Sequence, residues 1–399
     1  MKVLVINTGS SSIKYQLFDM PEGTVLCSGL VERLGESVGK ITHKQLKGGS
    51  ENTFHEEKPI ANHSSGMQLI AALLVDETYG VLTDANEVGL VGHRVVHGGE
   101  EFSKTTQITE AVKNKIRELA PLAPLHNPPN LIGIEVAENI FPNATQVGVF
   151  DTAFHQSIPE YAYRYAIPNK LYKEHGIRVY GFHGTSHRYV TKRAAILLNK
   201  PLNEVNLITI HLGNGASMAA VKGGKSIDTT LGLTPLPGLV MGTRSGDIDP
   251  GILFYLNETL GYSLTEIKNI LNKESGLKGL SGDNDVREIS ERASKGDKVA
   301  FMALQVYTYR IKKYIGAYIA AIGKVDALVF TAGVGENSSM VRSMSVEGLE
   351  HIGVRIDSKK NEERGGERNI SASGASVDVW VIPTNEELEI ANQSYELLK

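Results

Sequence analysis

The sequence predicts two α/β domains of similar plan, and three glycine-bearing turns carry that prediction. The first turn follows strand-like residues 3–6, and the second lies within a similar hairpin at residues 207–221. The third follows the apolar run 327–330 and leads into helix-like sequence. A chain of 399 residues is also too long for one core of ordinary size. Strands that alternate with helices in this way are typical of α/β domains.

The first turn is rich in small hydroxyl residues and is followed by a lysine. Residues 7–12 read Asn-Thr-Gly-Ser-Ser-Ser, with Ser10 and Ser12 among them and Lys14 on the return strand. Such a hairpin directs backbone N–H groups, hydroxyls and an ammonium group toward one place, which suits a polyphosphate. Alone, the turn is equally consistent with an ordinary connection in a sheet.

The second and third turns strengthen the polyphosphate interpretation. Residues 211–217 read His-Leu-Gly-Asn-Gly-Ala-Ser, and residues 331–338 read Thr-Ala-Gly-Val-Gly-Glu-Asn-Ser. A glycine loop that opens a helix leaves N–H groups free to hold an adenosine or its phosphates. Three such elements in this order predict a nucleotide held between two related halves.

The composition excludes several classes of protein. Hydrophobic residues make up 41% and charged residues 22% of the chain, as in soluble globular proteins. The net charge of −4 gives no reason to expect nucleic acid or an anionic membrane surface as a partner. One cysteine, Cys27, excludes a disulfide framework and fits a reducing compartment. We therefore expect a cytoplasmic protein without a membrane span.

The first half of the chain alternates strands with helices. Residues 1–60 are strand-rich, with a polar turn at Lys47–Ser50. A buried strand is expected at 88–96 and a short one at 145–149. The proline-rich segment 121–129 is predicted to be a rigid loop, which either holds a side chain at a fixed height or is a plain helix connector.

We place the domain boundary after the strand that ends near residue 150. The first domain is predicted to comprise residues 1–150 together with 387–399, and the second to comprise 151–386. A long helix is expected at 298–322, where apolar residues recur at helical spacing. A short amphipathic helix at 385–397 is expected to pack back on the first domain.

Five charged residues are candidates for a functional site. Arg94 and Arg244 each adjoin a buried segment and a glycine-rich turn, which an anion site would explain. Asp151 follows a buried strand and is either a metal-associated or catalytic carboxylate or a helix cap. Glu386 and Glu387 begin the last helix, where the helix dipole accounts for one carboxylate but not obviously for both.

Two nucleotide-binding motifs are imitated but not matched. Gly224-Lys225-Ser226 resembles the end of a P-loop, but Ala219 stands where that motif needs glycine. A hairpin turn is the better explanation. In the third glycine turn, Ser338 takes the place of the last glycine of a dinucleotide-binding fingerprint. A Rossmann fold is therefore not expected.

Two histidine pairs at i, i+4 do not predict a metal site. His93 and His97 lie in strand-like sequence, where four residues span ~13 Å. His183 and His187 lack the glutamate that follows the first histidine of a zinc-protease helix. Ligation of a metal by these histidines is not expected.

Five segments resemble the acetate and butyrate kinase family. They are residues 3–14, 93–99, 182–187, 208–223 and 383–387. The resemblance covers the whole chain and implies two RNase H-like domains of the acetate and sugar kinase, heat-shock 70 and actin superfamily, with the nucleotide in the interdomain cleft. It also implies transfer of a phosphoryl group from ATP to acetate by a homodimeric enzyme.

The same resemblance implies four groups of site residues. Asn7 and Glu386 would hold Mg²⁺, for which Mn²⁺ is an alternative. The carboxylate of acetate would bind Arg94, and its methyl group would bind Val96, Leu125, Phe182 and Pro235. Phosphoryl transfer would involve Asp151, His183 and Arg244. ATP or ADP would contact Ser10, Ser12, Lys14, His211, Leu212, Gly213, Asn214, Gly215, Asp285, Val286, Arg287, Gly333, Val334, Gly335, Glu336 and Asn337.

Elementary chemistry limits the role of Asp151. Acetate is already ionised at neutral pH, so no base is needed to make the nucleophile. We therefore interpret Asp151 as a residue that orients the metal shell or the arginines. Two alternative functions stay open: a propionate or butyrate kinase, because one methylene is worth only ~1–3 kcal/mol in an apolar pocket, and a non-catalytic ATP-binding switch like the actin and heat-shock relatives.

Overall fold

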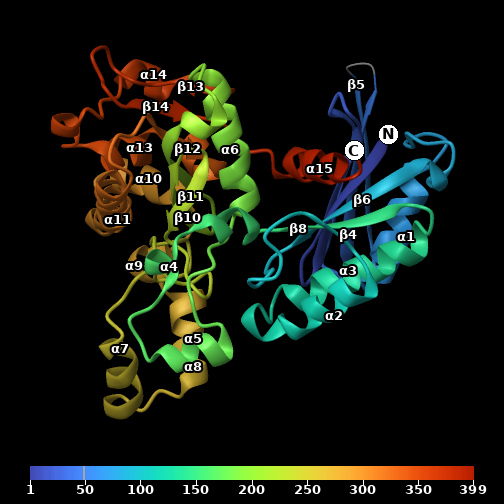
Figure 1. Ribbon diagram of the computed structural model, residues 1–399, viewed down its shortest axis with the longest axis horizontal. Helices are drawn as coiled ribbons and strands as arrows, with labels where there is room; N and C mark the ends of the chain where they lie inside the picture. Colours follow the sequence, from blue (N-terminus) through green and yellow to red (C-terminus); the bar gives the residue numbers. More distant parts are fainter. Residues whose placement is uncertain (48–49) are drawn as a thin grey trace. The chain divides into compact units, whose positions relative to one another are not determined.

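The structure is a computed structural model that describes residues 1–47 and 50–399 (Figure 1). The turn predicted at Lys47–Ser50 includes residues 48–49, which lie outside the described residues. The chain divides into two compact units. The first unit comprises Met1–Phe154 and Asn385–Lys399, and the second comprises His155–Thr384.

The first unit is built on an eight-stranded sheet, with β3, β2, β1, β6 and β8 adjacent in that order. β1 pairs antiparallel with β2 and parallel with β6, which in turn pairs parallel with β8. The strands are β1 (Lys2–Thr8), β2 (Ser12–Asp19), β3 (Thr24–Glu32), β4 (Gly39–Lys47), β5 (Ser50–Lys58), β6 (Val88–Val95), β7 (Thr106–Gln107) and β8 (Thr145–Phe150). The helices are α1 (His63–Leu74), α2 (Glu110–Glu118), α3 (Asn127–Ile140) and α15 (Glu386–Leu397).

Residues of β1 alternate between two cores, because successive side chains of a strand point to opposite faces. Leu4 and Ile6 belong to the core beneath α1 and α3, together with Met67 and Ala137. Val3 and Val5 belong to the opposite core, together with Ile390 of α15. A strand buried on both faces is apolar throughout, which is why the amino terminus is so hydrophobic.

The predicted C-terminal helix is confirmed as α15, and it contacts β1, β2, β6 and β8 of the first unit (Figure 1). Asn385 caps it by accepting a hydrogen bond from the Leu388 N–H at 3.0 Å. The contacts of α15 place residues 385 and 386 in the first unit, whereas the sequence placed them in the second. At the other boundary, the Asp151 N–H donates to the Val95 carbonyl at 2.9 Å. Asp151 therefore also belongs to the first unit.

The proline-rich segment 121–129 is not one loop, because its last residues open α3. Pro128 and Pro129 lie in the first turn of that helix, where a missing N–H costs nothing. The prolines thus mark a helix start that was not predicted.

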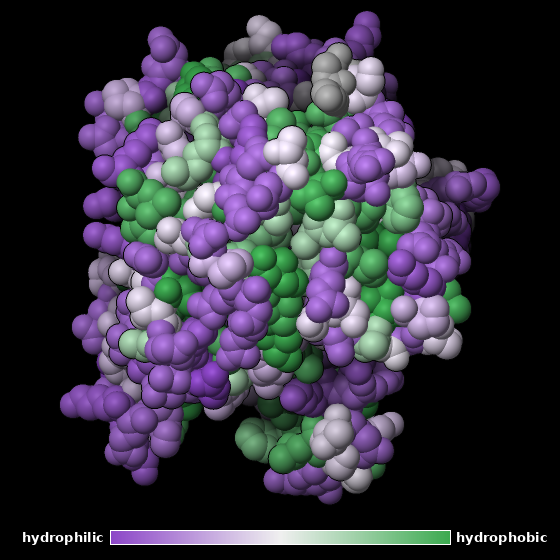
Figure 2. Space-filling model, turned by 90° about the vertical axis from the view of Figure 1, so that its right-hand side faces the viewer, coloured by the Kyte–Doolittle hydropathy of each residue, from purple (hydrophilic) through white to green (hydrophobic). Residues whose placement is uncertain are grey.

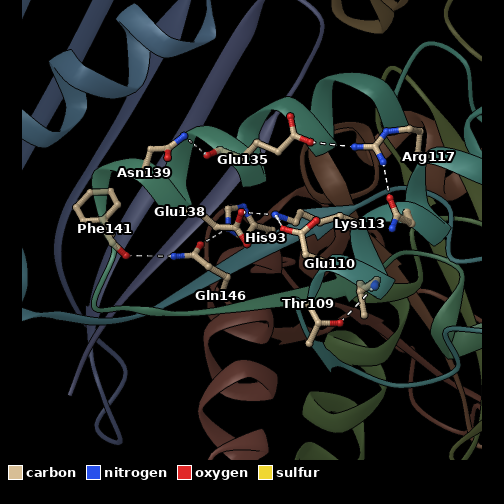
Figure 3. Close-up of polar contacts among 12 residues, drawn as sticks. His93, Thr109, Glu110, Lys113, Arg117, Glu135, Glu138, Asn139, Phe141 and Gln146 are labelled. Carbon is tan, nitrogen blue, oxygen red and sulfur yellow. Dashed lines mark hydrogen bonds and ion pairs between the residues drawn. The ribbon is translucent and has the colours of Figure 1, made fainter.

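Figure 3 shows how charged side chains join α2 to α3. Lys113 Nζ lies 2.5 Å from Glu110 Oε1 and 2.7 Å from Glu138 Oε2.

The second unit is built on a six-stranded sheet in which β11, β10, β9, β12 and β14 are adjacent in that order. The strands are β9 (Asn206–Leu212), β10 (Ala216–Lys222), β11 (Lys225–Thr229), β12 (Ala327–Thr331), β13 (Arg368–Asn369) and β14 (Asp378–Val381). The α-helices are α4 (Glu160–Tyr163), α5 (Asn169–His175), α6 (Gly184–Leu197), α7 (Gly251–Phe254), α8 (Leu264–Asn269), α9 (Gly276–Ser281), α10 (Val286–Ser294), α11 (Lys298–Ile322), α12 (Ala332–Asn337), α13 (Ser339–Val346) and α14 (Ser358–Glu362).

The second hairpin and the long helix of this unit are confirmed. β9 and β10 pair antiparallel, and β9 pairs parallel with β12. The predicted helix at 298–322 is α11, which is followed by Gly323 at a φ of 88°. α11 contacts β9 and β10, and α6 contacts β9 and β12. The predicted hairpin turn at Gly224 is also present, since it joins β10 to β11.

Hydrophilic side chains are spread between apolar ones over the face that Figure 2 shows. Within residues 1–47 and 50–399, no helix is both long enough and apolar enough to cross a bilayer.

Candidate active site

The first glycine turn, residues 9–11, joins β1 to β2 and contains the exposed Ser10. The Gly9 N–H donates to the Ser12 carbonyl at 2.8 Å, which closes the turn. The strand register places Asn7 directly opposite Lys14. The predicted metal ligand and the predicted phosphate-binding lysine therefore share the same end of one hairpin.

Lys14 is held by an acidic residue at the start of α15. Its Nζ lies 2.5 Å from Glu387 Oε1, while 55% of the lysine side chain stays exposed. Glu387 is oriented by the helix whose first turn it occupies. The ammonium group is therefore held at the end of the hairpin without being removed from solvent.

Arg94 and Asp151 form a two-pronged ion pair at the ends of adjacent parallel strands. Arg94 Nε lies 3.0 Å and Arg94 Nη2 lies 2.6 Å from Asp151 Oδ2. The Asp151 side chain is 1% exposed, against 21% for Arg94. Burial opposes the charge of Arg94, but Asp151, Glu386 and Glu387 outweigh it and raise its pKa. Asp151 thus holds the Arg94 side chain in place.

The carboxylate of Glu386 is destabilised by its surroundings. Burial raises the pKa of Glu386, Arg94 lowers it, and the neighbouring Asp151 and Glu387 raise it further. A divalent cation would offset this repulsion. Within the part of the chain that the structure describes, no three His, Cys, Asp or Glu side chains surround one metal position. The residues therefore fit Mg²⁺ held by one carboxylate and substrate phosphates, and not a metal enclosed by protein alone.

Asn130 of α3 ties the ends of β1 and β6 together, a role that was not predicted. Its Oδ1 accepts a hydrogen bond from the Val96 N–H at 3.1 Å, and its Nδ2 donates to the Thr8 carbonyl at 2.7 Å. Gly133, one turn later, lets α3 approach, because a Cβ there would collide with the Thr8 side chain. Leu125, predicted to contact the methyl group, is 68% exposed just before α3.

His183 and Arg244 meet beside the second glycine turn, in the second unit. A Cβ placed on Gly215 would lie 3.6 Å from His183 Nε2 and 3.6 Å from Arg244 Nη1. His183 precedes α6 with a φ of 57°, a left-handed backbone conformation that is strained for a residue other than glycine. Residues held in strained conformations cluster at functional sites. The structure therefore brings together two residues that the resemblance assigned to phosphoryl transfer.

Arg244 is half-buried, and it makes no ion pair among the described residues. Its Nη1 donates to the Pro235 carbonyl at 3.1 Å and lies 3.7 Å from the sulfur of Met241. Burial lowers the pKa of Arg244. A guanidinium group that is desolvated without a carboxylate partner favours an anion from outside the protein.

The second unit contains a cavity of about 810 Å³, which the second glycine turn helps to line. Eight predicted nucleotide contacts line it: Gly213, Asn214, Asp285, Val286, Arg287, Gly333, Val334 and Asn337. Nine residues that were not predicted also line it: Gly242, Leu277, Asn284, Ser290, Tyr307, Ser338, Ser339, Met340 and Arg364. The size and the convergent polar groups suit a nucleotide.

One of the unpredicted residues shapes this cavity by having no side chain. A Cβ on Gly242 would lie 2.5 Å from Asn214 Oδ1, and the Gly242 N–H donates to the Asn214 carbonyl at 3.3 Å. The glycine turn and the loop that carries Arg244 are therefore held in direct contact. Because Gly242 lies only two residues from the predicted site residue Arg244, the sequence contained a signal that Gly242 also belongs to the site.

Asp285 and Arg287 form the rim of the cavity. Asp285 caps α10, accepting a hydrogen bond from the Arg287 N–H at 2.8 Å. Its Oδ2 also lies 2.5 Å from Arg287 Nη2. The hydrogen bonds from Arg287, first from its side chain and then from its backbone, lower the pKa of Asp285 to about 2. Arg287 is 88% exposed and faces solvent.

Five of the predicted nucleotide contacts in this unit do not line the cavity. Leu212 is fully buried, and His211 Nδ1 lies 2.8 Å from the Ser186 hydroxyl. Glu336 Oε1 accepts a hydrogen bond from the Thr384 N–H at 3.3 Å. The five are His211, Leu212, Gly215, Gly335 and Glu336.

The four residues predicted to surround the methyl group are divided between the units. Val96 and Leu125 belong to the first unit, whereas Phe182 and Pro235 belong to the second. Phe182 is buried, and its carbonyl accepts a hydrogen bond from the His155 ring at 3.0 Å. The methyl pocket therefore stays a prediction.

The sequence relatives identify the family. The model of the acetokinase family matches residues 2–392. The chain belongs to the acetokinase family. The acetate kinase of Oleidesulfovibrio alaskensis is 55% identical to it over 401 residues, which cover 100% of both chains. The acetate kinase of Flavobacterium johnsoniae is 53% identical over 400 residues, again with complete coverage of both.

Solved structures of the acetokinase family share the fold of this chain. Porphyromonas gingivalis acetate kinase superposes with a TM-score of 0.95 at 48% identity, covering 100% of each chain. A propionate kinase from Francisella tularensis superposes with a TM-score of 0.92 at 42% identity, covering 99% of each. These proteins have the duplicated actin-like ATPase fold, so the predicted α/β fold with two RNase H-like domains is confirmed.

Proposed function

We propose that this protein is an acetate kinase, which transfers the γ-phosphoryl group of ATP reversibly to acetate and forms acetyl phosphate and ADP. A carboxylate oxygen of acetate attacks the γ-phosphorus, and the bond from that phosphorus to the bridging oxygen of ADP breaks. Support comes from the family membership of the whole chain and from acetate kinases that are more than half identical to it.

The observation that carries this proposal is the environment of Arg244. Its guanidinium group is half-buried without a carboxylate partner among the described residues. It lies beside His183 at Gly215, which follows a residue that lines the 810 Å³ cavity, Asn214. A transferring phosphoryl group carries negative charge on three equatorial oxygens. Arg244 and His183 would donate hydrogen bonds to those oxygens, and they need no reorganisation at the moment of transfer.

Acetate would be bound by Arg94 in the first unit. The ion pair to Asp151 fixes the plane of the guanidinium group, so that the arginine is positioned before the substrate arrives. Acetate needs no general base, because it is ionised at neutral pH. Asp151 therefore acts through Arg94 and is a positioning residue in this mechanism.

Asn7 and Glu386 would hold Mg²⁺, with Mn²⁺ as an alternative because both ions prefer oxygen ligands. The raised pKa of Glu386 supports this role, because a nearby cation would stabilise its charged form. When bound, the metal would neutralise charge on the phosphate oxygens of ATP. Lys14, oriented by Glu387, supplies a further positive charge toward those phosphates.

The test is to trap acetyl phosphate as a hydroxamate in a reaction with ATP, Mg²⁺ and acetate. The proposal predicts hydroxamate that depends on all three components and equals the ADP released. ATP hydrolysis without trapped product would instead support the ATP-binding switch. The comparisons do not favour that switch, because the full-length relatives carry the names of kinases.

A propionate kinase is the second candidate, because one such enzyme superposes with a TM-score of 0.92. Measuring kcat/KM for acetate, propionate and butyrate separates the candidates. Acetate is expected to give the highest value, since relatives that are 55% and 53% identical to this chain are named acetate kinases.

We also propose a homodimer in the cytoplasm. The single cysteine, Cys27, is free and buried, which fits a reducing compartment. Light scattering of the purified chain would measure the oligomeric state, and a monomer at micromolar concentration would contradict this part of the proposal.

A further inference from the structure

A buried serine holds the His183 ring through a hydrogen bond at its Nδ1 atom. His183 Nδ1 lies 2.8 Å from Ser217 Oγ, and the same oxygen lies 2.8 Å from Nε2 of a second histidine, His187. Ser217 and His187 are both fully buried. A hydroxyl has one hydrogen, so Ser217 can donate to only one of the two rings and must accept from the other.

The direction of the hydrogen bonds in this chain is assigned from a threonine. His187 Nδ1 lies 2.7 Å from Thr209 Oγ1, whereas the other acceptor near that hydroxyl, the Ala219 carbonyl, is 3.5 Å away. The shorter distance favours a hydrogen bond donated by Thr209 to His187. Burial, and then the nearby His155 and His211, lower the pKa of His187 well below its usual value. A neutral His187 that accepts at Nδ1 carries its proton on Nε2.

The remaining assignments follow one from another. His187 Nε2–H donates to Ser217, so the Ser217 hydroxyl donates to His183 Nδ1. A neutral His183 that accepts at Nδ1 must then carry its own proton on Nε2. That nitrogen faces Gly215 and the Arg244 guanidinium group, where the proposed function places the phosphoryl group.

We propose that Thr209, His187 and Ser217 form a relay that fixes the proton of neutral His183 on Nε2. The relay rests on the proposed function and deepens it, because it makes His183 a hydrogen-bond donor to the phosphoryl oxygens without a positive charge. Ser217 and His187 are accordingly positioning residues, which act through His183. In the relay, protons keep their places and no bond between heavy atoms changes.

Among the described residues of the second unit, His211, Arg244 and His187 are titratable or charged groups near His183. The His211 ring of β9 stacks on it, with centroids 4.4 Å apart and planes at 20°. The Arg244 guanidinium group adjoins it across Gly215, and His187 reaches it through Ser217. Arg244 disfavours an imidazolium beside it, which agrees with a donor that works in its neutral form.

The same sheet offers a matched control. Ser226 is also fully buried on a strand, and its Oγ also lies 2.8 Å from a histidine Nδ1, that of His155. This bond is outside the relay. Ser226→Ala therefore removes a buried serine–histidine hydrogen bond of the same length without touching His183.

The kinetic test compares kcat in Ser217→Ala and Ser226→Ala. Ser217→Ala is expected to lower kcat about 10- to 100-fold, because a loosened or wrongly protonated histidine misplaces the donor. The KM values for ATP and acetate should change less than about threefold. Ser226→Ala should keep kcat within about twofold. Equal losses of kcat in the two variants would overturn the relay.

The spectroscopic test observes the tautomer directly. Histidine-labelled protein at pH 8 is examined by ¹H–¹⁵N correlation, and the His183 signals are assigned by their absence in His183→Gln. His183 is expected to carry its proton on Nε2 in the wild type and in Ser226→Ala, and to populate both tautomers in Ser217→Ala. A proton on Nδ1 in the wild type would overturn the proposal.

Two further points keep the result interpretable. If Ser217→Ala does not fold, Thr209→Val removes the first donor while keeping the side-chain shape, and the same tautomer change is expected. If the wild type makes no acetyl phosphate, the proposed function fails, whereas the tautomer of His183 still reports on the relay.

Discussion

The two units have sheets of the same plan but carry different chemistry at the ends of their strands. The order β3-β2-β1-β6-β8 in the first unit repeats as β11-β10-β9-β12-β14 in the second. In the first unit, β1 pairs antiparallel with β2 and parallel with β6. In the second unit, β9 pairs in the same way with β10 and β12. The glycine turns 9–11 and 213–215 therefore occupy equivalent positions.

The equivalent strand ends hold charges in the first unit and uncharged side chains in the second, where β12 ends at Thr331 and β14 at Val381. β6 and β8 end at the Arg94–Asp151 ion pair. β12 instead runs into α12, whose first residue, Ala332, has a φ of 62°. The difference teaches that the fold fixes where groups converge, while the residue at each strand end fixes which ligand is bound. Under the proposed function, the first unit takes the carboxylate and contacts the ATP phosphates through Lys14 and the metal, whereas the cavity of the second unit takes the rest of the nucleotide.

The largest expected effect tests the anion site of the second unit. Arg244→Ala should lower kcat by about 10³-fold or more, because it removes a cation from the phosphoryl group in transfer. The measurement is kcat with ATP and acetate at saturation. Arg193→Ala is the control, because Arg193 is an arginine of the same unit whose charge is already paired, 2.7 Å from Glu367. A near-normal kcat in Arg244→Ala would show that the second unit has no anion site at Arg244.

The next-largest effect distinguishes two buried histidines. His93 of the first unit contributes to stability, whereas His187 of the second unit is proposed to position His183. His93 Nε2 lies 2.8 Å from Gln146 Oε1 (Figure 3), and burial lowers its pKa to about 4. Unfolded histidine titrates near ~6.5, so the unfolded chain takes up this proton first as the pH falls. Stability is therefore complete above that pH and decreases toward pH 4, by up to about 3 kcal/mol.

Urea unfolding of the wild type and of His93→Gln between pH 7 and pH 4 would measure this contribution. The variant should show a weaker dependence on pH and an unchanged kcat, whereas His187→Gln should lower kcat. Parallel pH profiles in the wild type and His93→Gln would show that His93 is not the group that titrates.

A smaller effect concerns the acetate side of the comparison. Arg94→Ala should raise the KM for acetate about 10- to 100-fold, as expected for the loss of hydrogen bonds to a charged group. The KM for ATP should change much less, because Arg94 does not line the nucleotide cavity and is not one of the proposed contacts to the phosphates or the metal. Steady-state kinetics with each substrate varied in turn provides the measurement. An equal rise in both KM values would contradict the assignment of Arg94 to acetate.

Features encoded locally were predicted from the sequence. The three glycine turns, the helix 298–322 and the amphipathic C-terminal helix are present, because turn residues and helical periodicity act over a few positions. The start of α3 was missed, because Pro128 and Pro129 were interpreted as loop residues although proline is common in the first turn of a helix.

Site residues brought together by tertiary packing were not predictable in the same way. Tyr307 and Met340 reach the cavity from α11 and α13, and their helical spacing indicates only burial. Asn130 joins two strand ends through a helix far away in sequence. Ser217 lies within a predicted turn, yet its bonds to two histidines depend on how α6 packs against β9.

The smallest expected effect distinguishes two functions of one carboxylate at the cavity rim. Asp285 caps α10 and pairs with Arg287, and a cap is typically worth about 1 kcal/mol. Asp285→Ala should lower the free energy of unfolding by that amount. Asp285→Asn should restore most of it, because asparagine also caps helices but cannot form the ion pair. If nucleotide binding needs only the cap, the asparagine variant also keeps the wild-type KM for ATP. A raised KM in both variants, with stability restored only by asparagine, would show instead that the charge of Asp285 orients Arg287 toward the nucleotide.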